Sequence, residues 1–128
     1  MPENPAHHLS EAAESVRAFN HTSRTAAKDW EFPGDAYRAV GSLSSLLGML
    51  EQTIQQSTRP VMNTYEHGRV RIDGNGDPDV KVAELIDAQN DALEAAAALS
   101  SAVQRMHSAT SPMGVDTSGM PEFEDDEG

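Results

Sequence analysis

The apolar residues of the middle third of the chain recur in a regular pattern. Seven of them follow one another at steps of four, three, four, three, four and seven residues: Ala36, Val40, Leu43, Leu47, Leu50, Ile54 and Val61. This period places the side chains on one face of a long amphipathic helix, and such a face needs another helix as its neighbour. The pattern therefore predicts a bundle of helices, although it indicates no reaction.

Turn-forming residues set the bounds of this helix. Pro33–Gly34 indicates a turn before it, Asp35 begins it, and Gly68 is a natural C-cap at its end. Pro60 interrupts it, because proline removes one backbone hydrogen bond and clashes with the preceding turn. We therefore expect a helix over 35–67 with a kink or a break at Pro60.

Two further stretches have helical character. The first begins at Asn4–Pro5, an N-cap residue with proline at the first helical position, and closes at Trp30. The last begins at Asp77–Pro78 in the same way and runs to about His107. Its predicted buried residues are Val82, Ile86, Leu93, Ala96, Leu99, Val103 and Met106. Gln89 falls on the same face as a polar interruption of the kind that sets helix register.

The connection between the last two helices is predicted to be non-helical. Arg69–Ile72 alternates like a short strand, and Asp73–Gly76 is turn-forming throughout. Within the long helix, Gly41, Ser45 and Gly48 form a strip of small residues, which predicts the close approach of a neighbouring helix. Together these patterns indicate an all-α fold, an antiparallel up-down-up three-helix bundle with a kinked long middle helix.

The charged residues divide the chain near residue 107. The 21 acids against 9 bases give a net charge of −12, and residues 108–128 hold six of the acids and no base. This last stretch also contains prolines and glycines, and its composition cannot bury enough apolar surface to offset the entropy of ordering. We expect one helical domain over 1–107 and a disordered acidic tail over 108–128.

Composition and charge narrow the functional classes. The chain contains no cysteine, which excludes disulfides, thiolate chemistry and cysteine-based zinc sites. Its net negative charge repels phosphate backbones, so nucleic acid is not expected as a partner. No apolar stretch approaches membrane-spanning length, and no basic segment followed by an apolar run marks the N-terminus. We therefore expect a soluble, cytoplasmic protein.

One acidic loop resembles the calcium loop of EF-hand proteins. The matching residues are Asp73, Asn75, Asp77, Asp79 and Glu84. Position six, where that family has glycine, is Pro78, whose φ is fixed at about −65°. A polar turn, an N-cap and acids in the first helical turn explain the same residues. A ligand- or metal-responsive regulator that uses the 73–84 loop is therefore the alternative function.

No sequence pattern indicates catalysis. Glu84, Asp87, Asp91 and Glu94 follow one another at steps of three and four on the last helix, which is typical of a solvated face. The chain has no Glu-x-x-His, nucleophile-elbow, phosphate-loop or dinucleotide pattern. Among the histidines, only the adjacent pair His7–His8 has a spacing that suits a metal. We therefore expect neither an enzyme nor a cofactor.

Three aromatic residues gather near the predicted first corner. Trp30, Phe32 and Tyr37 lie within eight residues, and tryptophan and tyrosine are favoured anchors at protein interfaces. The corner resembles that of WXG100-type secreted helical hairpins, which carry tryptophan and glycine between two helices. Here Trp30–Gly34 reads Trp-Glu-Phe-Pro-Gly rather than Trp-x-Gly. Neither Tyr37 nor Tyr65 is followed four residues later by an acid, as that family's export signal requires.

The stretch 7–107 as a whole resembles small uncharacterised helical proteins of actinomycetes, and the excess of arginine over lysine is similar to high-GC actinobacterial usage. We predict a non-catalytic protein–protein interaction or assembly protein, with Trp30, Phe32 and Tyr37 as partner-binding residues. A homo-oligomer formed through spare apolar surface on the middle helix is one form of this hypothesis. A WXG100-like secreted helical protein is the second alternative.

Overall fold

The computed structural model describes residues 4–25 and 29–119 of the chain. Its regular elements are five α-helices: α1 (Ala6–Thr22), α2 (Pro33–Gly48), α3 (Leu50–Ser57), α4 (Arg59–Glu66) and α5 (Pro78–Thr110). None of the described residues forms a strand, so the all-α prediction is confirmed. The chain divides into two compact units, Met1–Ala36 with Gly114–Gly128 and Tyr37–Met113, and each is described by itself.

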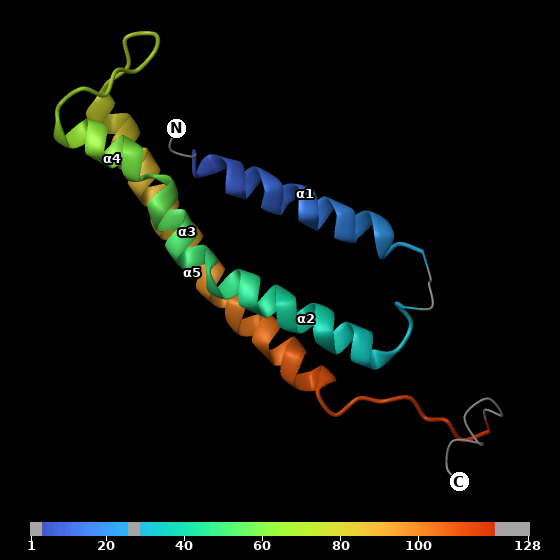
Figure 1. Ribbon diagram of the computed structural model, residues 1–128. Helices are drawn as coiled ribbons and strands as arrows, with labels where there is room; N and C mark the ends of the chain where they lie inside the picture. The colour runs from blue at the N-terminus through green and yellow to red at the C-terminus, as the bar shows by residue number, and fades with distance from the viewer. Residues whose placement is uncertain (1–3, 26–28, 120–128) are drawn as a thin grey trace. The chain divides into compact units, whose positions relative to one another are not determined.

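The second unit is an antiparallel helical hairpin. Helices α2, α3 and α4 follow one another along α5 as one bent middle segment (Figure 1). Three contacts fix the register: Gly41 lies against His107, Thr58 donates a hydrogen bond to Gln89, and Tyr65 donates one to Asp79. Because the partner's number falls as the residue number rises, the two arms run in opposite directions. The predicted long bent middle helix, packed against the last helix, is confirmed.

The middle segment is interrupted at Met49 and at Thr58. The second break lies two residues before Pro60, because Pro60 occupies the first turn of α4, where a missing N–H leaves no bond unmade. The break predicted at Pro60 is thus confirmed, but it lies at Thr58. The break at Met49 was not predicted; its N–H donates to the Leu46 carbonyl at 3.1 Å, a tighter three-residue step.

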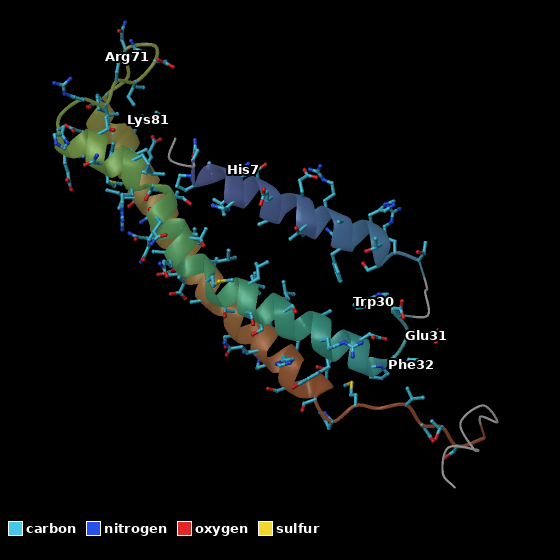
Figure 2. All side chains as sticks on the ribbon, viewed as in Figure 1. His7, Trp30, Glu31, Phe32, Arg71 and Lys81 are labelled. Carbon is cyan, nitrogen blue, oxygen red and sulfur yellow. The ribbon has the colours of Figure 1, made fainter. Side chains whose placement is uncertain are left out.

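The start of α2 differs from the prediction. Pro33 is the first residue of the helix and does not form a turn ahead of it. The Asp35 carboxylate accepts hydrogen bonds from the backbone N–H groups of Glu31 and Phe32, at 3.2 and 3.1 Å. An acid at the third helical position that reaches back in this way is half of a capping box, and it stabilises a start two residues earlier. Figure 2 labels Glu31 and Phe32 in the segment just before α2.

Gly68 ends α4 as predicted. Its φ is +67°, and its N–H donates to the Tyr65 carbonyl at 2.9 Å, while the N–H of Arg69 donates to the Thr64 carbonyl at 3.1 Å. This pair of bonds is a Schellman motif, which requires a residue that adopts positive φ without strain.

The connection after Gly68 contains no strand, so the strand-like interpretation of Arg69–Ile72 was wrong. Alternation over four residues is insufficient where no neighbouring strand offers hydrogen bonds. The chain instead turns at Gly74 and Asn75, both with positive φ, and the Ile72 side chain folds against Gly76. Figure 2 shows Arg71 in this loop, beyond the end of α4.

Helix α5 begins as predicted and ends three residues later than expected, at Thr110. The Asp77 side chain caps it by accepting a hydrogen bond from the Asp79 N–H at 2.9 Å, and Pro78 is the first helical residue. A buried or half-buried row repeats every seven residues, as in a coiled coil: Val82, Gln89, Ala96, Val103 and Thr110. Gln89 therefore lies in the interface, where the polar interruption was predicted.

Several predicted core residues are exposed. The exposed fractions are 41% for Ile86, 50% for Leu99 and 51% for Met106 in α5, and 43% for Leu43 and 37% for Val61 in the middle segment. Small and large side chains share the interface beside the row: Gly41, Ser44, Ala92 and Ser100 are half-buried, and so are Leu46, Leu50, Leu85 and Leu93. In α5, Leu99 and Met106 lie on one flank of this row and Ile86 lies on the other.

The first unit contains α1. Its apolar side chains Leu9, Val16 and Phe19 are each nearly half exposed, and the helix ends at Thr22 rather than at Trp30. Residues 20–23 are weak helix formers, which accounts for the early end. Ala26 and Ala27, apolar residues in the last part of the predicted first helix, lie outside the described residues. The packing of α1 as the third member of a bundle stays a prediction.

The segment after α5 has no regular structure over 112–119. The Asp116 carboxylate accepts a hydrogen bond from the Ser118 N–H at 3.0 Å, and this bond to the ionised form lowers the pKa of Asp116. The prediction of a disordered tail over 108–128 is therefore wrong for 108–110, which continue α5. Its last part, 120–128, lies outside the described residues.

Two glycines of α2 give a matched test of the interface. A methyl group at Gly41 would lie 2.9 Å from His107 Nε2, whereas one at Gly48 would meet nothing within 4 Å. Alanine is favoured over glycine in a helix by about 1 kcal/mol. We expect Gly48→Ala to raise the melting temperature by a few degrees and Gly41→Ala to lower it or leave it unchanged, by circular dichroism. Equal gains in both variants would contradict the close approach.

Candidate functional site

The structure gives each acidic residue of the 73–84 loop a local role. Asp77 caps α5, Asp79 accepts a hydrogen bond from the Tyr65 hydroxyl at 2.6 Å, and Glu84 pairs with Lys81 at 3.0 Å. Asp73 lies 3.7 Å from Arg71, with its side chain almost fully exposed.

The calcium candidates are therefore not gathered around a common point. Among residues 4–25 and 29–119, no group of three or more histidine, aspartate or glutamate side chains is arranged to hold a metal ion. Pro78 is the first residue of α5, at the position where the EF-hand pattern needs a flexible turn. The calcium interpretation of this loop has no geometric support.

Tyr65 closes the looped end of the hairpin. Its hydroxyl joins α4 to the first turn of α5, across the 69–77 connection. The hydrogen bond to Asp79, with smaller effects of burial and of the Asp79 and Asp77 charges, raises the pKa of Tyr65. The sequence alone does not indicate this pair, because no spacing rule links residues separated by a loop of this length.

The three aromatic candidates are in different surroundings. Trp30 packs edge-on against Phe19, with ring centroids 5.5 Å apart, and Phe32 is 38% exposed; both belong to the first unit. Tyr37 belongs to the second unit and stacks on His107, with centroids 4.4 Å apart and an interplanar angle of 20°. The three were predicted as one partner-binding group, and the structure describes them in two separate units.

The remaining polar candidates are at the surface. Glu84, Asp87, Asp91 and Glu94 are all exposed, as expected of a solvated stripe. His7 pairs with Glu11 at 2.7 Å, four residues along α1, rather than forming a metal site with His8. His107 is the histidine that takes part in helix packing, a role the sequence analysis did not assign. No described helix is long and apolar enough to cross a membrane.

The contact of Gly41 with His107 identifies which flanks of α2 and α5 lie together. On α5, Ser100 and His107 lie on one side of the row through Ala96 and Val103, and Leu99 and Met106 lie on the other. On α2, Gly41 and Gly48 lie on one side of Ser44, and Val40, Leu43 and Leu47 lie on the other. These positions follow from helical geometry alone.

Since Gly41 touches His107, the side of α2 that carries Leu43 coincides with the side of α5 that carries Leu99 and Met106. We call these three side chains the apolar face. Each is about half exposed, and Val40 and Leu47 lie beneath them at the interface of the two arms. The apolar face is the candidate site of this protein.

The part of the hairpin that carries the apolar face has almost no charge. Residues 39–50 of the middle segment contain no charged side chain, and neither do residues 95–104 of α5. The register contacts place these two stretches beside each other, and we call them the uncharged band. In a chain of net charge −12 this absence is informative, because the centres of protein interfaces are depleted in charged residues.

Comparison with protein-family models, with curated proteins and with solved structures found no match to this chain. The apolar face is therefore interpreted from its own geometry.

The closure by Tyr65 gives a test in alkaline solution. The neutral phenol holds the hydrogen bond, so a raised pKa means that this contribution to stability is present below the ordinary value of 10.0 and is lost as the pH rises above it. Between pH 8 and 11 we expect the melting temperature of the wild type to fall more steeply than that of Tyr65→Phe. Parallel curves for the two proteins would contradict this role of Tyr65.

The acidic loop gives a second test. Because its carboxylates are occupied by a cap, a tyrosine and two ion pairs, calorimetric titration with calcium should give no saturable heat. Asp73→Ala should behave like the wild type. A saturable micromolar isotherm that disappears in Asp73→Ala would restore the regulator hypothesis.

Proposed function

We propose that this chain acts through protein–protein association, without catalysis, and that the apolar face of its hairpin binds a helical surface. The observation that carries the proposal is the position of the large side chains. Leu43, Leu99 and Met106 stay about half exposed, although Leu47 and Val103 beside them are buried between the arms. Exposed apolar surface without neighbouring charge is typical of binding sites.

The energetic gain on association is modest for each side chain. Complete burial of a leucine or methionine contributes about 1.5–3 kcal/mol, so covering the exposed half of each contributes on the order of 1 kcal/mol. Three such residues and the alanines beside them favour a reversible complex.

We place this activity in the cytoplasm, an assignment supported by the absence of cysteine and of a membrane-spanning helix among the described residues.

The absence of native cysteine permits a clean cross-linking experiment. A photoreactive maleimide on Leu99→Cys probes the apolar face. The matched control is Ile86→Cys, which has a similar exposed fraction but lies on the other flank of α5. In extract of the native host we expect protein adducts of Leu99→Cys and not of Ile86→Cys.

Competition by unlabelled chain tests whether the cross-linking at residue 99 is specific. An excess of unlabelled wild-type chain should suppress adducts with other proteins of the host, and an excess of Leu43→Asp should not, because a charge on the apolar face would oppose docking. Absence of adducts at residue 99, or equal adducts at both positions, would contradict the proposal.

A further inference from the structure

The hairpin is divided by charge along its length. Its open half, residues 37–50 with 95–113, contains Arg38 and Arg105 and no acid. Its looped half, residues 51–94, contains nine acids against four lysines and arginines, a net charge of −5. The antiparallel register makes this a division in space as well as in sequence, because Thr58 and Gln89 meet near the boundary.

This division decides how two hairpins could lie together. In a parallel pair, the half with nine acids would lie against its own copy, and like charges in contact oppose association. In an antiparallel pair centred on the uncharged band, the two acidic halves point away from each other, and most of their acids lie outside the overlap. The uncharged band then lies at the centre, where charges would be most costly to bury.

We infer that the partner of the apolar face is a second copy of this chain, bound antiparallel about a two-fold axis through the uncharged band. This inference rests on the proposed function, since it names the occupant of the same face. A two-fold interface must be complementary to itself. A two-fold axis perpendicular to the hairpin lays each arm against the same arm of the other copy. In α5, Leu99 and Met106 lie on either side of the level of residue 46, so Leu99 of each copy lies opposite Met106 of the other.

The area of overlap sets the strength of the pair. The axis lies near the level of residue 46, so about 18 residues of each arm overlap, a length of about 27 Å at 1.5 Å per residue. Two helices 8–10 Å apart present a face roughly 20 Å wide, which gives about 500 Å² per copy. A total near 1,000 Å² is at the lower limit for a specific complex, so the dimer should be weak and dependent on concentration.

Light scattering on the full chain between 1 and 500 µM tests the association. The expected result is a rise in mass towards twice 13.8 kDa over this range. Leu99→Asp should remain a monomer, whereas Ile86→Asp, on the other flank of α5, should dimerise like the wild type. Circular dichroism of both variants confirms that they are folded.

Orientation is tested by spin labels. Asn63 is an exposed, uncharged position in α4, about 17 residues from the axis, so labels on Asn63→Cys should lie about 50 Å apart in the antiparallel dimer. A parallel dimer would bring them within about 30 Å and would overturn the inference.

A monomer at every concentration would also overturn this inference. The proposed function would then be tested separately, by the cross-linking experiment. Adducts of Leu99→Cys with a different protein would support it, and their absence would reject both.

Discussion

The close approach of α2 and α5 at Gly41 and His107 is the contact on which the rest of the hairpin depends. A single methyl group at residue 41 would lie 2.9 Å from the imidazole, and the same ring stacks on Tyr37 one turn away. The contact therefore identifies the flank of α5 that faces the middle segment. The hydrogen bond between Thr58 and Gln89 continues the register towards the loop.

The interface between the two arms buries few residues completely. Only Leu47, Val82, Ala96 and Val103 are fully buried apolar residues among those the structure describes. Helices that approach closely gain many contacts between backbone and side chain, but they bury fewer large side chains than a leucine-rich coiled coil does. The apolar face adds to this shortage of burial, because Leu43, Leu99 and Met106 remain about half exposed beside the interface. Stability and association are thus linked in this protein, since covering that face adds burial that the hairpin lacks by itself.

The sequence was sufficient for the helical content, the bent middle segment, the caps at Asp77 and Gly68, and the place of Gln89, because each depends on local chemistry or on a seven-residue spacing. The sequence was insufficient to predict which flank of α5 faces α2. Leu99 and Met106 were predicted to be buried on the basis of their hydrophobicity, whereas the flank of α5 that faces α2 is that of His107, which lies against Gly41. The Tyr65–Asp79 bond and the break at Met49 depend on the path of the chain around the loop and along α5, which periodicity does not encode.

The central claim is that α5 presents the flank of Ser100 and His107, and not that of Leu99 and Met106, to α2. Nuclear Overhauser effects from the Gly41 α-protons test it most directly, because they report neighbours within about 5 Å of a residue that has no side chain of its own. The account predicts cross-peaks from Gly41 to the ring protons of His107. Cross-peaks from Gly41 to the methyl groups of Leu99 or Met106, with none to the His107 ring, would contradict it.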